Sequence, residues 1–216
     1  MEKIKKSLSV AHAVYDKVRA DYVRGMSEKD IKKIILDVCA GCGYGGDIVA
    51  GVRSSLIEGD ATDYTPTEGD TIILDLQFNA DGKWCDTTRT FFVGKPSSEV
   101  VAAYEAVLAA KSAGEASLAD GVRACDIHTA VCRSFGGYAE YFPHHAGHLV
   151  GDDPVVKPQF LPDVQQSIHA GDVAALEPGV YFEGKFGIRV EDNYLVTDSG
   201  MENLFGYTTR IEDFML

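Results

Sequence analysis

Four carboxylates lie in segments whose neighbouring residues are typical of buried β-strands. Two of them, Asp75 and Asp86, stand on either side of a turn-forming sequence in "ILDLQFNADGKWCDTTRTF". A two-residue loop, at Ala80-Asp81 or at Asp81-Gly82, would close a hairpin there. Both aspartates would then lie on one face, opposite or diagonal to each other. Burying carboxylates this close together requires a countercharge, because unpaired buried charges cost several kcal/mol.

The second pair of carboxylates, Glu177 and Glu191, repeats this arrangement in the last third of the chain. They belong to "DVAALEPGVYF" and "GIRVEDNYLVT", two apolar segments that we expect to be strands. A loop over residues 183–185 would set the two glutamates across from each other on one face. A one-residue change of register would separate them.

Two kinds of positive partner can compensate these four carboxylates. Arg89 lies three residues after Asp86 and Arg189 two residues before Glu191, and they could form two buried ion pairs without a metal. Alternatively, four carboxylates neutralise two divalent cations, and a shared carboxylate holds such ions about 3.5–4 Å apart. We favour the cations and keep the two ion pairs as the alternative.

A histidine-rich segment, "FPHHAGHLVG", offers the nitrogen ligand that such a metal centre would use. His148 is the preferred candidate, because Gly147 and the apolar pair Leu149-Val150 indicate a strand that enters the core. His145 is expected at the surface or in a structural role.

The remaining segments predict the elements that position these residues. Apolar residues at helical spacing predict a helix over 2–24, and Ser27 with Asp30 predicts the capping box of a second helix. Two more helices are expected in the middle of the chain, the first capped by Ser97 or Ser98. Strand pairs follow each set of helices, and "GYTTRIEDF" is the last expected strand. This order describes an α+β chain.

The charge of the chain argues against two classes of partner. It has 33 acidic and 20 basic residues and a net charge of −13, so its field repels nucleic acid and anionic membranes. No apolar segment has the length of a transmembrane helix, and the start "MEKIKK" is not followed by the apolar core of a signal peptide. We therefore expect a cytoplasmic protein with no nucleic-acid and no membrane partner.

The five cysteines are an odd and scattered set, which suits reduced thiols better than disulfides. Cys39 and Cys42 form a C-x-x-C pair at a glycine-rich helix end, but no second pair completes a zinc site. We do not expect a redox or metal role for them.

A family resemblance lies in four segments: "LDLQFNADGKWCDTTRTFFVG", "PHHAGHLVG", "LEPGVYF" and "GIRVEDNYLVT". Together they resemble the metal-binding motifs of the M24, or pita-bread, metallopeptidases, which include Xaa-Pro aminopeptidase, prolidase and methionine aminopeptidase. Five ligand positions agree at once, across nearly the whole chain. The resemblance implies the pita-bread fold, a curved antiparallel sheet covered by helices and built from two pseudo-equivalent halves.

The resemblance also implies the ligands of a dinuclear centre. Asp75 would bind one divalent metal ion, and Asp86 and Glu191 would bridge both ions. His148 and Glu177 would bind the second ion, and Glu177 would also move a proton during catalysis. A hydroxide between the ions would attack the scissile carbonyl. The oxygen-rich ligands favour manganese, cobalt or iron, with zinc as a further option.

Four further positions follow from the resemblance. His144 matches a histidine that lines the substrate pocket, and Arg189 matches an arginine that helps orient the metal-site carboxylates. A simple salt bridge between strands is the alternative for Arg189. Two substrate-side histidines of the family are replaced here by Glu58 and Val155, and losing one such donor costs about a hundredfold or more in rate. Glu58 is a candidate for binding a cationic group of the substrate instead.

These expectations combine into a dinuclear metal-dependent hydrolase of the Xaa-Pro aminopeptidase or dipeptidase type, which cleaves a short peptide or small amide. The missing histidines leave two alternatives: a degenerate binding protein with this fold, or a different metal-dependent reaction, since relatives hydrolyse creatine or cleave a C–S bond. We expect one catalytic domain over residues 1–216, without the N-terminal domain of full-length prolidases. A homodimer is left open.

Overall fold

The computed structural model describes residues 1–41, 46–53 and 59–216, the side chain of Arg53 excepted. The helices are α1 (Glu2–Asp21), α2 (Glu28–Gly41), α3 (Ser98–Ser117) and α4 (Ala124–Phe135), with short 3-10 helices η1 (Gly136–Tyr141) and η2 (Ile211–Phe214). The strands are β1 (Ile48–Arg53), β2 (Thr71–Ala80), β3 (Lys83–Phe92), β4 (Gly147–Leu149), β5 (Val156–Gln159), β6 (Val173–Leu176), β7 (Gly179–Phe182), β8 (Phe186–Arg189), β9 (Asp192–Thr197) and β10 (Gly200–Asn203). The expected α+β class is confirmed.

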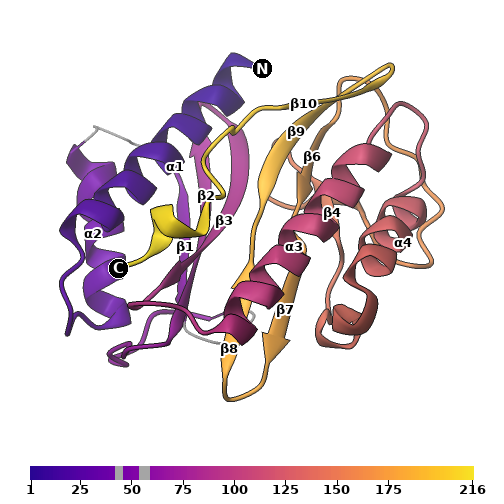
Figure 1. Cartoon of the computed structure of the whole chain (residues 1–216). Helices are drawn as coiled ribbons and strands as arrows, with labels where there is room; N and C mark the ends of the chain where they lie inside the picture. The colour runs from indigo at the N-terminus through magenta and orange to yellow at the C-terminus, as the bar shows by residue number, and fades with distance from the viewer. Residues whose placement is uncertain (42–45, 54–58) are drawn as a thin grey trace.

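The elements form two halves that lie side by side (Figure 1). In the first half, α1 and α2 lie on the outside of the antiparallel sheet β1-β2-β3. In the second half, α3 and α4 lie on the outside of the sheet β10-β9-β6-β4-β5 and the hairpin β7-β8. The strands of both halves therefore occupy the middle of the molecule, between two layers of helices.

The predicted helix caps are confirmed. The backbone N–H of Asp30 donates to Oγ of Ser27 (3.2 Å), and the N–H of Ser27 donates to the carboxylate of Asp30 (2.8 Å). Ser97, rather than Ser98, caps α3, because its Oγ accepts from the N–H of Val100 (3.3 Å). These bonds satisfy N–H groups that have no partner inside the helix.

Strands β2 and β3 form the predicted hairpin, and its loop is Asp81-Gly82. The loop residues have φ values of 55° and 85°, as a type I′ turn requires, and glycine adopts such values without steric strain. The register pairs Gln77 with Asp86, two positions along the strand from Asp75. The two aspartates are therefore diagonal neighbours on one face.

The second acidic pair lies at a gap between two ladders. β6 pairs with β9 up to Leu176 and Asp192, and β7 pairs with β8 in the same register from Gly179 onwards. Glu177 is therefore aligned with Glu191 across the gap. The predicted register is confirmed, and the one-residue shift does not occur.

Each of the two strands expected around this pair is divided in two. β6 ends at Leu176 and β7 begins at Gly179, because Pro178 between them has no N–H to donate to a ladder. On the partner side, β8 ends at Arg189 and β9 begins at Asp192. Both glutamates lie in these interruptions: the N–H of Glu177 donates to the carbonyl of Ala146 in the same half (3.1 Å), whereas the backbone of Glu191 pairs with the other half.

The two halves meet at one of these interruptions. The backbone N–H of Glu191 donates to the carbonyl of Thr88 on β3 (3.0 Å), and the N–H of Thr88 donates back to Glu191 (3.4 Å). Nearby, Oγ1 of Thr90 donates to the carbonyl of Arg189 (2.9 Å). These bonds hold the hairpin that carries the two aspartates against the strands that carry the two glutamates.

The prediction of a strand at "GYTTRIEDF" is wrong. This segment is irregular and ends in η2. The carbonyl oxygens of residues 207–209 accept hydrogen bonds from the side chains of Arg89 and Tyr104 instead of from a neighbouring strand. The last residue then joins the first half, because the N–H of Leu216 donates to the carbonyl of Phe92 (2.8 Å).

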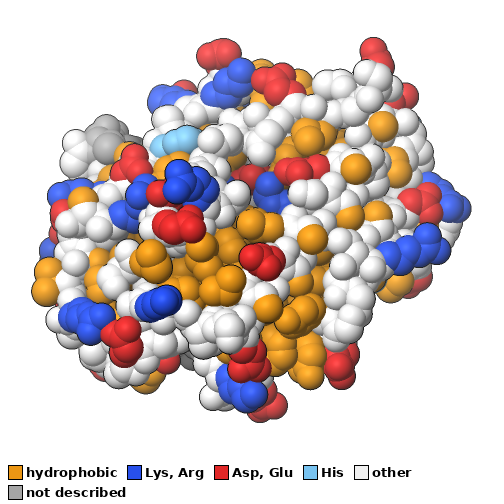
Figure 2. Space-filling view, in the orientation of Figure 1, with side chains coloured by type: hydrophobic (Ala, Val, Ile, Leu, Met, Phe, Trp, Pro, Cys, Tyr) orange, Lys and Arg blue, Asp and Glu red, His pale blue; other side chains and the backbone are white. Residues whose placement is uncertain are grey.

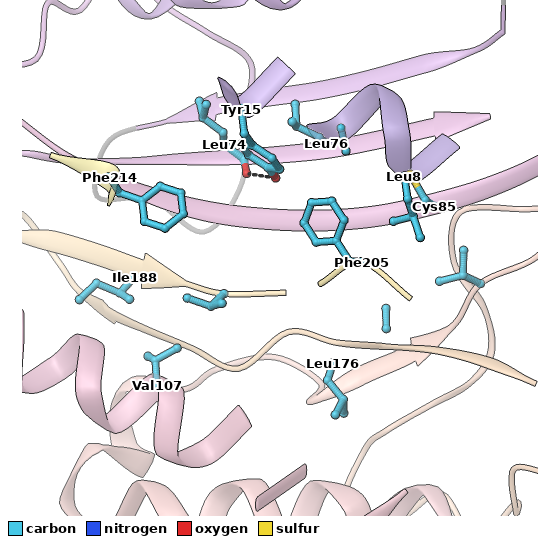
Figure 3. Close-up of a cluster of buried hydrophobic side chains, with 14 of the residues drawn as sticks. Leu8, Tyr15, Leu74, Leu76, Cys85, Val107, Leu176, Ile188, Phe205 and Phe214 are labelled. Atoms are coloured by element: carbon cyan, nitrogen blue, oxygen red, sulfur yellow. Dashed lines mark hydrogen bonds between the residues drawn. The ribbon is translucent and has the colours of Figure 1, made fainter. Parts of the chain in front are cut away.

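The hydrophobic core is one cluster that extends through both halves (Figure 3). Leu8 and Tyr15 project from α1 into this cluster, and the hydroxyl of Tyr15 donates to the carbonyl of Leu74 on β2 (3.3 Å). In the second half, Val107 of α3 lies near Ile188 of β8. All five are at most 2% exposed, and burying each side chain stabilises the fold by about 1.5–3 kcal/mol.

Arg89 is wholly buried, but its partner is Asp192 rather than a carboxylate of the two acidic pairs. The guanidinium donates to Oδ1 of Asp192 (2.6 Å), and Lys111 lies 2.7 Å from Oδ2. Burial alone would raise the pKa of Asp192, but Arg89 and Lys111 lower it to about 2. The alternative in which Arg89 and Arg189 form ion pairs with the two acidic pairs is therefore wrong for Arg89.

The surface in Figure 2 carries acidic and basic side chains interspersed with one another. Within the described ranges, every helix is too short or too polar to cross a lipid bilayer. Among the described cysteines, Cys85 and Cys125 are buried free thiols, Cys132 is a partly buried one, and Cys39 is buried. Cys42 lies outside the described residues, so the C-x-x-C prediction stays a prediction.

Candidate active site

The two acidic pairs and His148 surround one cavity of about 80 Å³. Its lining is Asp75, Gln77, Asp86, His144, His145, His148, Val155, Glu177, Arg189 and Glu191. The side chains of Asp86, His148 and Glu191 are at most 4% exposed. The structure thus brings together the site residues named from the sequence, with one exception: Glu58 lies outside the described residues.

His148 projects from β4 with one ring nitrogen directed at the carboxylates. Its Nδ1–H donates to the carbonyl of Leu149 (2.9 Å), so Nε2 is the nitrogen that faces the carboxylates. Nε2 lies 3.3 Å from Glu177, 3.5 Å from Asp86 and 3.9 Å from Glu191. A ring held through its second nitrogen in this way is typical of a metal-binding histidine.

Two of the carboxylates have one oxygen bonded and one oxygen without a partner. The amide of Gln77 donates to Oδ2 of Asp86 (3.0 Å), and the hydroxyl of Thr88 donates to Oε2 of Glu191 (2.8 Å). Oδ1 of Asp86 and Oε1 of Glu191 are buried and have no hydrogen-bond partner among the described residues. A buried acceptor in this state requires a compensating group in the cavity.

Arg189 supplies the positive charge for Asp75. Its Nη2 donates to Oδ2 of Asp75 (2.6 Å), and its Nη1 donates to the hydroxyl of Tyr181 (3.0 Å). Tyr181 in turn donates to Nε2 of His144 (2.9 Å). The salt bridge that was the alternative for Arg189 is present, and it links the carboxylate of Asp75 through Tyr181 to His144, a residue of the cavity.

Burial and mutual repulsion shift the pKa values of the carboxylates. Burial raises the pKa of Asp86 to about 7, against the opposing effect of His148. Burial and the neighbouring carboxylates raise the pKa of Glu191 well above its usual range. Burial alone would raise the pKa of Glu177 too, but His145 and His148 lower it well below its usual value. The cluster therefore resists full ionisation unless further positive charge enters.

The donor atoms fit divalent cations. Metal–ligand distances of about 2.0–2.2 Å place adjacent ligand atoms roughly 3.0–3.5 Å apart. Nε2 of His148 lies at such distances from Glu177 and Asp86. Ligand atoms of Asp86, His148 and Glu191 all lie within 4.8 Å of one another. Carboxylate oxygens with an imidazole nitrogen suit manganese, cobalt, iron or zinc.

Two residues of the cavity are not predicted from the sequence. Gln77 faces Asp86, and the hairpin register was the signal for it, because Gln77 alternates with Asp75 along β2. His145 was expected at the surface or in a structural role, but its Nδ1 lies 3.0 Å from Oε1 of Glu177. No pattern in the sequence indicates which face of the chain His145 occupies before β4.

A larger cavity of about 440 Å³ adjoins the acidic one. Asp75, Gln77 and Arg189 line both cavities and form the boundary between them. The rest of its lining is Lys32, Leu36, Ile48, Val49, Ala50, Gly51, Gly59, Asp60 and Ile73. A molecule in the larger cavity therefore reaches the carboxylates past these three shared side chains.

Gly147, directly before His148, has no room for a side chain. An added Cβ would overlap the carbonyl oxygen of Ala175 and lie 2.9 Å from the ring of Phe160. We expect Gly147→Ala to lower the free energy of unfolding by about 1–3 kcal/mol in denaturant titrations. Gly200→Ala, with nothing within 4 Å of the added Cβ, is the control and is expected to change it by less than about 0.5 kcal/mol. Equal effects of the two would contradict this.

Comparisons with known proteins agree with this geometry. Residues 2–198 match Metallopeptidase family M24. The chain is 33% identical over 159 residues to an Xaa-Pro dipeptidase of Pyrococcus horikoshii, covering 73% of this chain and 45% of that protein. It is 32% identical over 155 residues to the uncharacterized peptidase YqhT of Bacillus subtilis, covering 71% of this chain and 44% of that protein. The chain thus spans about half the length of the curated relatives it matches.

Solved structures show the same likeness. An X-Pro aminopeptidase from Thermotoga maritima superposes with a TM-score of 0.93 at 28% identity, covering 100% of this chain and 62% of that one. A dipeptidase PepE from Mycobacterium ulcerans superposes with a TM-score of 0.91 at 26% identity, covering 97% of this chain and 58% of that one. Because the family match covers nearly the whole sequence and the fold agrees throughout, this chain belongs to metallopeptidase family M24 and has its pita-bread fold.

Proposed function

We propose that this chain is a metal-dependent peptidase of the Xaa-Pro aminopeptidase or dipeptidase type, working with two divalent cations. The observation that carries the proposal is the buried group of Asp86, His148 and Glu191, whose ligand atoms lie within 4.8 Å of one another. The names of relatives, Xaa-Pro dipeptidase and X-Pro aminopeptidase, support the reaction class. The proposed substrate is a short peptide or small amide that enters through the larger cavity.

Five side chains would hold the cations. Asp75 would bind one ion. Asp86 and Glu191, each with one buried oxygen that has no hydrogen-bond partner in the described part of the chain, would bind both. His148 and Glu177 would bind the other ion. Two such ions acidify a water molecule and polarise the scissile carbonyl, which is the chemistry they supply when bound. Manganese is the proposed ion, with cobalt, iron or zinc able to replace it.

The protein's own groups would move the protons and place the substrate. Glu177, 12% exposed and facing the cavity, would take the proton of the attacking water and pass it to the leaving amine. Burial lowers the pKa of His144 to about 4, so it is a neutral imidazole. His144 would give up its hydrogen bond with Tyr181 and form a hydrogen bond with the substrate. Arg189 would hold Asp75 and meet the substrate at the boundary between the cavities.

Removing the metal tests the proposal. Protein depleted with a chelator is expected to lose cleavage of Xaa-Pro dipeptides, and Mn²⁺ or Co²⁺ is expected to restore it, measured as released proline. Glu177→Ala should lower kcat/KM by about a hundredfold or more, because a positioned acid–base group contributes about that much. Glu183→Ala, in the exposed loop between β7 and β8, is the control and should leave it unchanged. Folded, metal-loaded protein that is inert on a broad peptide panel would refute the proposal.

A further inference from the structure

His145 lies directly against Glu177 in the acidic cavity. Nδ1 of His145 is 3.0 Å from Oε1 of Glu177. Both atoms are buried, and neither has a hydrogen-bond partner among the described residues. Two lone-pair atoms this close repel each other unless a proton or a cation joins them. A proton on Nδ1 would make this contact an ion pair, whereas a cation would make the two atoms ligands of one ion.

The separation is that of two ligands on one metal ion. With metal–ligand distances of about 2.0–2.2 Å, adjacent ligand atoms lie roughly 3.0–3.5 Å apart. Oε1 of Glu177 lies 3.0 Å from Nδ1 of His145 and 3.3 Å from Nε2 of His148. Two imidazoles therefore converge on the same carboxylate oxygen from opposite ends of the "HAGH" segment.

His144 does not compete for this role, although its ligand atom lies within 4.8 Å of those of His145 and Glu177. Nδ1 of His144 donates to the backbone carbonyl of His145 (2.8 Å), and Nε2 accepts from Tyr181 (2.9 Å). Both of its nitrogens are engaged. Within this group, the Nδ1 atom of His145 is the nitrogen left for a cation.

We propose that His145 is a sixth protein ligand of the metal centre, binding through Nδ1 the cation that Glu177 also binds. This inference rests on the proposed function, because it needs a cation in the acidic cavity. A second imidazole adds a nitrogen donor to an otherwise oxygen-rich set. Zn²⁺ and Co²⁺ gain more from imidazole than Mn²⁺ does, so His145 raises the selectivity of the centre for Zn²⁺ and Co²⁺ over Mn²⁺.

Calorimetric titration of metal-depleted protein with Zn²⁺, Co²⁺ and Mn²⁺ tests the assignment without an activity measurement. For His145→Ala we expect the Zn²⁺ affinity of one site to fall about tenfold or more, and the Mn²⁺ affinity to fall less. The Zn²⁺-to-Mn²⁺ affinity ratio should therefore drop. His169→Ala is the matched control, because His169 is exposed and paired with Asp120 (3.2 Å), and it should leave the ratio unchanged. An unchanged ratio in His145→Ala would overturn the proposal.

His145→Asn separates a metal ligand from a hydrogen-bond donor. Asparagine keeps an N–H group for Glu177 but is a poor Zn²⁺ ligand, so this variant should bind Zn²⁺ as weakly as His145→Ala. Full Zn²⁺ affinity in His145→Asn would show that His145 only donates a hydrogen bond, and would overturn the proposal. If the unaltered protein binds no cation, the proposed function itself fails. If it binds two ions and both His145 variants bind them equally well, only the present assignment fails.

Discussion

Asp86→Asn is expected to lower kcat/KM on Xaa-Pro dipeptides by at least about a hundredfold and, at the same time, to stabilise the metal-free protein. Asp86 is 3% exposed and lies 3.5 Å from Nε2 of His148, so its carboxylate is at the centre of the proposed metal site. Asparagine offers one neutral oxygen in place of a charged carboxylate. Since loss of a group that merely supports a metal ligand costs about 10–100-fold in affinity, loss of a bridging ligand should cost at least as much.

The stabilisation of the metal-free form has a different physical cause. Burial and nearby carboxylates raise the pKa of Asp86 to about 7, so its charged form is disfavoured in the protein without metal. Removing that charge relieves repulsion, and we expect the free energy of unfolding to rise by about 1–3 kcal/mol without metal. The amide of Gln77 can still donate to the asparagine oxygen.

Thermal unfolding with and without Mn²⁺ measures both effects of this substitution. The unaltered protein should gain stability on adding Mn²⁺, because a ligand that binds only the folded state stabilises it. Asp86→Asn should start from a higher melting temperature and gain little from the ion. Asp81→Asn, an equal loss of charge at the exposed hairpin turn, is the control and should keep the full response to metal. A metal response in Asp86→Asn equal to that of the control would contradict the assignment of this residue.

Local signals account for the part of the site that the sequence predicts. Asp81-Gly82 is a strong turn signal, and a two-residue loop fixes the register of a hairpin. Because side chains alternate along a strand, the register places Asp75 and Asp86 on one face. The three-residue loop after Phe182 fixes the second register in the same way.

The breaks in the strands and the contacts between the halves depend on distant groups. The gap between β8 and β9 arises because Glu191 pairs with Thr88, a residue more than a hundred positions away. The "GYTTRIEDF" segment contains several residue types that favour strands, but its carbonyl groups accept hydrogen bonds from Arg89 and Tyr104. Periodicity shows which secondary structure a segment is able to form, whereas these long-range hydrogen bonds determine which structure it forms.

The position of His145 shows the same limit within the site. Its neighbour His148 is predictable because Gly147 marks a close approach between strands, and the added Cβ would indeed overlap Ala175. The orientation of the His145 side chain depends on the hydrogen bond from Nδ1 of His144 to the backbone carbonyl of His145. It also depends on how the chain enters β4. Spacing alone therefore finds one imidazole of the cavity and misses the other.

Arg89→Met is expected to lower the free energy of unfolding by about 3–5 kcal/mol, because it leaves the buried carboxylate of Asp192 without its main partner. The same guanidinium donates to the carbonyls of Glu191 and of residues 207–208, so its loss also loosens the contact between the halves. Urea unfolding measures the effect, and Arg123→Met, which removes an exposed ion pair, should cost less than about 1 kcal/mol. A loss below about 1 kcal/mol for Arg89→Met would mean that the buried pair does not hold the two halves together.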